Sequence, residues 1–176
     1  YFLAVGTIEP RKNLELLVRV WEQLLESGQC VPKLIWVGQF GWSNNKQLMR
    51  RFEKLQKLGY VELYSGLSDT ELFCRMQNAI AVLFPSKIEG WGLPLSEALS
   101  MRVPVLASDI AIFREVGQGV PELLELNDVA KWHLTILNYA QKNSKLRAAQ
   151  MARMNRYRVR SWPEHFQQVE DFLSLK

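Results

Sequence analysis

The chain carries the stretch IAVLFPSKIEGWGLPLSEA at residues 80–98. Its first five residues are apolar throughout, as in a strand that is covered on both faces of a sheet. Two glycines, Gly90 and Gly92, then interrupt the pattern, and Pro94 favours the first turn of a helix. The stretch therefore predicts a buried strand, a glycine turn and a helix in direct succession.

Similar short apolar runs recur on either side of this stretch, at residues 2–5, 34–37, 61–64 and 103–107. Between the first two, apolar residues spaced by three and four from Leu14 to Leu25 mark one side of a helix that Asn13 would cap. Ser68 and Glu71 fit a capping box at the start of another helix. Strands that alternate with helices predict an α/β fold, a Rossmann-like parallel sheet of five strands with helices on both faces.

The C-terminal part of the chain is predicted to be mostly helical. We expect helices over residues 127–141, from Ser144 to about Tyr157, and after Trp162. With 176 residues the chain has the length of one domain, which we assign to residues 1–176.

The composition excludes several classes of protein. Apolar residues make up 48% and charged residues 23%, as in a globular domain. No apolar run is long enough to cross a bilayer and no basic segment precedes residues 1–6, so we expect neither a membrane span nor an export signal. Two cysteines favour a reducing, cytoplasmic setting. Two histidines without a metal-binding spacing predict no protein-held metal and no cofactor.

The net charge of +4 is unevenly distributed along the chain. Residues 142–160 hold seven basic side chains and no acidic one: Lys142, Lys145, Arg147, Arg153, Arg156, Arg158 and Arg160. No nucleic-acid-binding motif accompanies them, so we expect no nucleic acid as a partner. The block is interpreted as a solvated face, a surface that meets another domain, or a peripheral contact with the inner face of the cell membrane.

The informative residues follow the predicted strands, because ligands of open α/β sheets bind beyond the carboxyl ends of the strands. Candidates are Gly6, Thr7, Arg11 and Lys12 after the first strand, Gly38 after the second, Leu67 and Ser68 after the third, and Gly90, Trp91, Gly92 and Leu93 after the fourth. Arg11 and Lys12 precede a helix, where an anion such as a diphosphate is favoured, although they could equally be solvated loop charges.

Two glutamates frame the glycine turn. Glu89 precedes it, and Glu97 lies about one turn inside the predicted helix, where its carboxylate could accept hydrogen bonds from two ribose hydroxyls. The backbone amides of residues 92–95 are expected to be unpaired and to point into the same crevice. The spacing alone is uninformative, since chance produces about one such pair; the surrounding EGWGLPLSE gives it meaning.

This block resembles the signature of the retaining, family 4 glycosyltransferases of GT-B fold, and the resemblance runs along nearly the whole chain. It implies that the chain is their C-terminal domain, which binds a GDP- or UDP-linked sugar, and that an N-terminal acceptor-binding domain is its partner. It implies transfer of a hexose with retention of configuration, as in polysaccharide biosynthesis, and an isolated domain that is inactive. Two departures are Thr7, where many members have arginine, and residues 117–125.

The resemblance also assigns roles to residues. Lys12, assisted by Arg11, would contact the donor diphosphate, and Glu89 would be the catalytic carboxylate. Glu97 would hold the ribose. The other substrate contacts would come from Gly6, Thr7, Gly38, Leu67, Ser68, Gly90, Trp91, Gly92 and Leu93. Two alternatives remain: a nucleotide-binding module without activity of its own, and a nucleotide-sugar epimerase, which would convert a nucleotide sugar without any acceptor.

Overall fold

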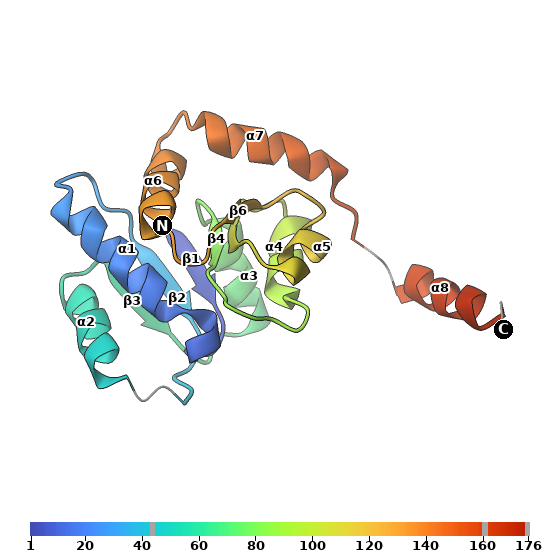
Figure 1. Ribbon diagram of the computed structural model, residues 1–176, viewed down its shortest axis with the longest axis horizontal. Helices are drawn as coiled ribbons and strands as arrows, with labels where there is room; N and C mark the ends of the chain where they lie inside the picture. Colours follow the sequence, from blue (N-terminus) through green and yellow to red (C-terminus); the bar gives the residue numbers. More distant parts are fainter. Residues whose placement is uncertain (43–44, 160–161, 175–176) are drawn as a thin grey trace.

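The computed structural model describes residues 1–42, 45–159 and 162–174. Its strands are β1 (Phe2–Val5), β2 (Leu34–Val37), β3 (Val61–Tyr64), β4 (Val82–Phe84), β5 (Val105–Ser108) and β6 (Glu122–Leu124). They pair in parallel as one sheet with the order β3-β2-β1-β4-β5-β6 (Figure 1). The predicted Rossmann-like parallel sheet is confirmed.

Helices cover both faces of this sheet. They are α1 (Leu14–Glu26), α2 (Lys46–Lys57), α3 (Asp69–Gln77), α4 (Leu93–Ser100), α5 (Ala111–Gly117), α6 (Val129–Ala140), α7 (Lys145–Arg153) and α8 (Trp162–Ser174), with 3-10 turns η1 (Pro10–Lys12) and η2 (Met154–Arg156). Helices α1, α2 and α6 share one hydrophobic core, and α3, α4 and α5 share the other. No helix of the described residues is long and apolar enough to cross a membrane.

The strands are apolar on both sides because each side faces a core. Phe2 and Ala4 of β1 point into the layer of α1, whereas Leu3 between them points into the layer of α4. Trp21 and Trp36 are completely or almost completely buried in the first layer. Burial of such large aromatic side chains supplies much of the hydrophobic stabilisation of a domain.

Two local predictions differ in outcome, and one strand has no counterpart among the predicted ones. The capping box of Ser68 and Glu71 at the start of α3 is confirmed. Asn13 is the N-cap residue of α1, as predicted, but it adopts a left-handed conformation (φ 55°) and its side chain makes no capping hydrogen bond. The sixth strand, β6, was not predicted, because it has only three residues, lies at the edge and is buried at only one of them.

Helix α7 joins the two layers across the amino end of the sheet. Leu146 packs against the first core, while Met151 and Met154 pack against the second. Between them, Gln150 is fully buried: its Nε2 donates to the Val105 carbonyl (2.5 Å), and its Oε1 accepts from the Val105 N–H (3.1 Å). One side chain thus takes the place of β6 beside Val105, because the pairing of β5 with β6 begins only at Leu106.

Replacing Gln150 with Leu should lower the free energy of unfolding by about 2–4 kcal/mol, because two buried backbone groups of Val105 lose their partner. Urea titration followed by circular dichroism measures the change. The control is Gln141→Leu, an exposed position at the end of α6, which should change stability by less than about 0.5 kcal/mol. Equal stability of the two variants would contradict the role of Gln150.

Candidate functional site

The strand order reverses between β1 and β4, which lie side by side although far apart in sequence. The chain leaves β1 towards α1 on one face and leaves β4 towards α4 on the other, so the two loops diverge, and we call the space between them the crevice. The loops are tied together, since the Lys87 N–H donates to the Arg11 carbonyl (2.8 Å). This crevice is the candidate site.

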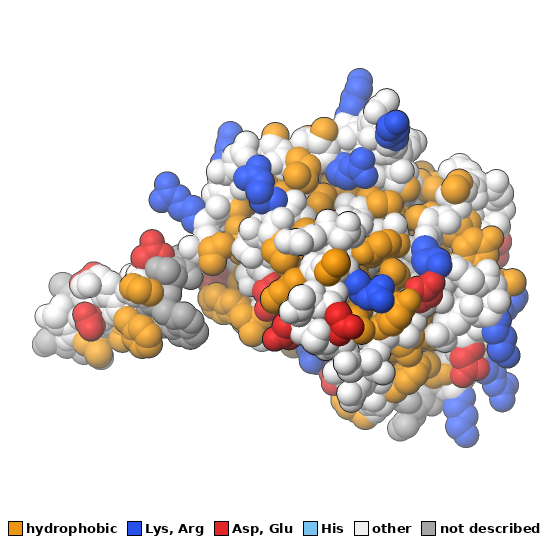
Figure 2. Space-filling model, turned by 180° about the vertical axis from the view of Figure 1, so that it is seen from behind, with side chains coloured by type: hydrophobic (Ala, Val, Ile, Leu, Met, Phe, Trp, Pro, Cys, Tyr) orange, Lys and Arg blue, Asp and Glu red, His pale blue; other side chains and the backbone are white. Residues whose placement is uncertain are grey.

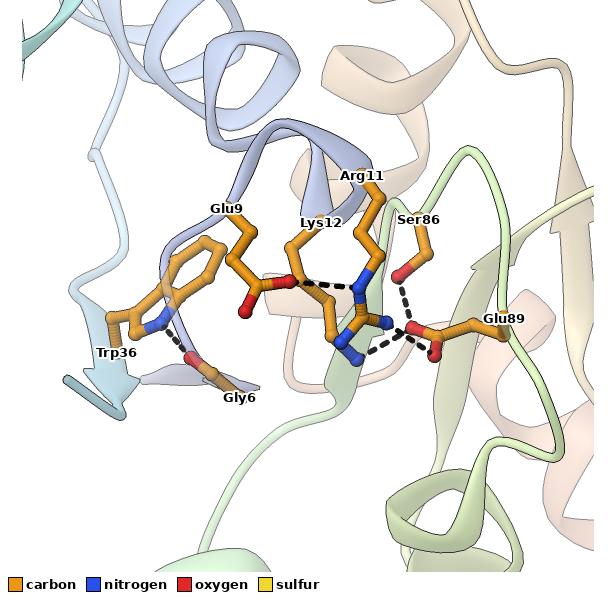
Figure 3. A network of polar contacts seen from close by, with 7 residues as sticks. All are labelled: Gly6, Glu9, Arg11, Lys12, Trp36, Ser86 and Glu89. Atoms are coloured by element: carbon orange, nitrogen blue, oxygen red, sulfur yellow. Dashed lines mark hydrogen bonds and ion pairs between the residues drawn. The ribbon is translucent and has the colours of Figure 1, made fainter. Parts of the chain in front are cut away.

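A network of charged side chains occupies the crevice (Figure 3). Lys12 Nζ lies 2.5 Å from Glu89 Oε1, and an Arg11 guanidinium nitrogen lies 3.0 Å from Glu89 Oε2. Ser86 Oγ donates to Glu89 Oε1 at 2.7 Å, and Arg11 Nε donates to Glu9 Oε2 at 2.8 Å. The three residues predicted to be catalytic therefore meet, and the network balances two cations with two carboxylates.

Burial makes this pairing necessary. The side chain of Glu89 is 7% exposed and that of Lys12 is 12% exposed. Burying a carboxylate this deeply costs desolvation free energy unless charged hydrogen-bond donors surround it. Three donors from two loops satisfy Glu89, and the same geometry places two cationic groups where an anionic ligand could reach them.

Two glycines let the loops after β1 and β2 touch. A Cβ atom on Gly38 would lie 2.1 Å from the carbonyl oxygen of Gly6, well inside any allowed contact. That oxygen accepts a hydrogen bond from Trp36 Nε1 at 2.7 Å (Figure 3). Thr7 follows at once and lies against Gly41. The backbone of Gly6, Thr7 and Gly38 thus lines the start of the crevice without bulky side chains.

The start of α4 presents free backbone donors. Gly92 adopts φ 77°, a left-handed conformation that favours glycine, and its carbonyl accepts from the N–H of Leu95 and Ser96. The predicted run of unpaired amides at 92–95 is therefore wrong at its end: Leu95 is bonded, and Pro94 has no N–H. The N–H groups of Gly92 and Leu93 make no hydrogen bond within the described part of the chain.

Glu97 lies on α4, half-buried, close to the N-terminus of α3. Burial raises the pKa of its carboxyl group, and the charge of Asp69 raises this pKa further. No hydrogen bond or ion pair joins the Glu97 carboxylate to any residue in the described ranges, and only its backbone carbonyl accepts hydrogen bonds, from Ser100 Oγ and the Met101 N–H. Its carboxylate is therefore available, unlike that of Glu89.

The loop before α3 offers fewer free hydrogen-bonding groups to a ligand than its sequence suggested. The hydroxyl group and the N–H of Ser68 both bond to Glu71 in the capping box, which leaves no free donor on Ser68. Leu67 is partly buried against the second core, and its backbone groups have no partner in the described residues. Asp69, next in the chain, brings this loop close to Glu97.

The rim of the crevice is apolar and exposed. Trp91 is 53% exposed and Leu93 61%, beside the open backbone of Gly90, and Trp42 after β2 is 70% exposed. Sequence reasoning missed Glu9 and Ser86, which complete the charge network. Their place directly after β1 and β4, the strands at the switch in strand order, is the signal that could have found them.

Comparison with known proteins identifies the family of this chain. Residues 1–147 match the family described as Glycosyl transferases group 1. The chain is 31% identical over 144 residues to O-antigen chain mannosyltransferase B of Escherichia coli, covering 82% of this chain and 38% of that protein. It is 35% identical over 120 residues to Serotype-specific mannosyltransferase WbdA of Escherichia coli, covering 66% and 14%. The chain belongs to the group 1 glycosyltransferase family and spans less than two fifths of these relatives.

Comparison with a solved structure identifies the fold. The S. aureus TarM mutant in complex with Fondaparinux, alpha-GlcNAc-glycerol and UDP superposes with a TM-score of 0.70 at 22% identity, over 87% of this chain and 31% of that one. The sheet is one Rossmann-like half of a GT-B glycosyltransferase fold.

Gly38→Ala should lower the free energy of unfolding by about 2–3 kcal/mol, because the loops after β1 and β2 must separate to admit the methyl group. Chemical denaturation measures this. The matched control is Gly90→Ala at the same edge, where nothing lies within 4 Å of the added Cβ. If Gly38→Ala is as stable as the control, the close approach of Gly6 and Gly38 is not a constraint.

Proposed function

We propose that this chain is the donor-binding domain of a retaining hexosyltransferase. It would bind a GDP- or UDP-linked sugar, while a separate N-terminal domain binds the acceptor. The convergence of Lys12, Arg11 and Glu89 in the crevice beside the start of α4 carries this proposal. The relatives named above are mannosyltransferases, which supports mannose as the hexose.

The diphosphate would bind where positive charge is concentrated. Lys12 and Arg11 provide two cations, and Gly92 and Leu93 provide unpaired N–H groups at the positive end of a helix dipole. The backbone of Gly6, Thr7 and Gly38 leaves room for phosphate oxygens. These groups would stabilise the charge that gathers on the diphosphate as the anomeric bond breaks, without a metal or other cofactor.

The nucleoside would extend towards α3. Glu97 is half-buried with a free carboxylate, which suits two vicinal ribose hydroxyls. Leu67 has free backbone groups in the loop beside Asp69, where they could contact the base, and Ser68 would only shape this loop because its cap uses its donors.

Glu89 would act on the transferred sugar. An incoming diphosphate competes with Glu89 for Lys12 and Arg11, so binding would leave Glu89 with Ser86 as its remaining partner. The carboxylate is then next to the bond that breaks, where it can stabilise positive charge on the sugar. Gly90 and Trp91, on the same loop, would border the sugar.

The exposed apolar rim favours a second candidate for the isolated chain. Trp42, Trp91 and Leu93 surround the crevice without cover among the described residues, as expected if another domain closes over the donor. The isolated chain would then bind nucleotides without catalysing transfer. Restoring the other domain should create hexosyl transfer to an acceptor, whereas conversion of a nucleotide sugar by the isolated chain would contradict this.

Lys12→Ala should weaken nucleoside diphosphate binding about thirtyfold, because a charge-assisted hydrogen bond contributes roughly 2 kcal/mol. Calorimetry with GDP, UDP and ADP measures affinity and identifies the base. In the complete enzyme, kcat/KM should fall by an amount that corresponds to roughly 2–4 kcal/mol. Lys33→Ala removes a surface cation paired with Glu62 and serves as the control. Unchanged affinity in Lys12→Ala would falsify the assignment.

Nucleotide affinity should increase with pH through the raised pKa of Glu97. The ionised carboxylate accepts two hydroxyl hydrogen bonds and the protonated form does not, so affinity falls as the pH drops through that pKa. Titration calorimetry between about pH 5 and 7.5 tests this, since the diphosphate itself titrates near pH 6.

Two variants separate these contributions. Glu97→Gln should retain only the pH dependence of the diphosphate, and Asp69→Asn should move the Glu97 step to lower pH because it removes a neighbouring negative charge. If wild type and Glu97→Gln show the same pH profile, Glu97 does not hold the nucleotide in its ionised form.

A further inference from the structure

A second concave surface lies at the opposite edge of the sheet. It is a hollow of about 340 Å³ at the amino ends of β4 and β5, between the end of α4 and α7. Its lining consists of Gln77, Ala79, Ile80, Met101, Arg102, Val103, Pro104, Arg147 and Met151. Two guanidinium groups thus stand in an otherwise mostly apolar depression.

These two arginines are held by neutral oxygen atoms. Arg147 donates to the carbonyls of Tyr139 (3.0 Å) and Lys142 (3.2 Å), and Arg102 donates to Asn155 Oδ1 (2.6 Å). Arg11, Arg51, Arg114 and Arg153, by contrast, all pair with carboxylates. Within the described ranges no carboxylate lies within ion-pair distance of Arg102 or Arg147, so their positive charge is fixed in place and uncompensated.

The backbone of Arg102 is itself unfavourable for an arginine. Its φ of 59° lies in the left-handed region, where glycine is preferred and a side chain is disfavoured. This conformation is common directly after a helix, and here the Val103 N–H bonds to the Ala98 carbonyl (2.9 Å) to end α4. Glycine can therefore replace Arg102 without straining the backbone, which allows a test of its side chain.

The segment of chain that contains Arg147 is also basic. Lys142, Lys145, Arg156 and Arg158 are exposed, and no acidic residue occurs between positions 142 and 160. Arg160, counted in the same block from the sequence, lies outside the described residues. In Figure 2 the visible charged side chains over the upper part of one face, where α7 runs in Figure 1, are Lys and Arg, whereas side chains of both charges occur lower on that face.

Residues 145–156 contain no aromatic side chain on which bases could stack, which argues against single-stranded nucleic acid.

We propose that this face binds an anionic lipid bilayer, with a lipid phosphate seated between Arg102 and Arg147. The surrounding lysines and arginines add attraction to the negative surface, at about fivefold in affinity per basic residue. The hollow is at the amino ends of the strands and the charged crevice is at their carboxyl ends, so both can be occupied at once. The inference does not depend on the proposed sugar transfer.

Sedimentation with vesicles of phosphatidylcholine containing about one third phosphatidylglycerol tests this at low ionic strength. The chain should bind these vesicles and dissociate from them as salt is added. It should not bind vesicles of pure phosphatidylcholine. Arg102→Gly should bind about fivefold more weakly, and Arg102→Gly with Arg147→Gln about thirtyfold more weakly. The melting temperature of Arg102→Gly should stay equal or rise, because glycine prefers this φ.

The control is Lys54→Gln with Lys57→Gln on the exposed side of α2, which removes the same charge and should retain affinity within about twofold. Equal losses in both double variants would overturn the proposal, because net charge alone would then explain binding. Absence of binding to phosphatidylglycerol vesicles would overturn it as well, even if inorganic phosphate binds the chain. Calorimetry with GDP and UDP on Arg102→Gly keeps the two sites distinguishable, since nucleotide affinity should not change.

Discussion

The need to neutralise one nearly buried carboxylate organises the functional edge of this domain. Glu89 is fixed by Lys12 and Arg11 from the loop after β1 and by Ser86 from its own loop, across the point where the strand order reverses. Removing any one of these donors leaves charge with too few partners in a place that water hardly reaches. The positions of the two loops, and hence the shape of the crevice between α1 and α4, follow from this network.

Most of the fold could be predicted because burial on both faces leaves an unmistakable pattern. Runs such as residues 34–37 are apolar at every position since a core lies on each side, and Ser68 with Glu71 marks a helix start by local chemistry alone. Short edge elements lack such signals. Residues 122–124 pair only with β5 and are mostly half-exposed, so their sequence does not reveal a strand. The left-handed turn at Asn13 likewise depends on tertiary packing.

The site was predictable in place but not in detail. Topology brings the residues after β1 and β4 together, which is why the sequence predicts that Lys12 and Glu89 belong to one site. The participation of Glu9, the bonded N–H of Leu95 and the use of both Ser68 donors in a cap depend on rotamers and on loop conformations. The proximity of Glu97 to Asp69 arises from how α4 packs beside α3, and no sequence pattern records it.

The charge network also has a consequence for selectivity. Glu89 is a competitor tethered beside Lys12, so its effective concentration there far exceeds that of any ion in free solution. Chloride or another monoanion that displaced Glu89 would replace one negative charge beside Lys12 with another, so its binding would gain no net electrostatic attraction. A ligand with two linked anionic groups can engage Lys12, Arg11 and the free amides of α4 together. In the proposed donor site, the Glu89 carboxylate would therefore favour multivalent anions over ions that carry a single charge.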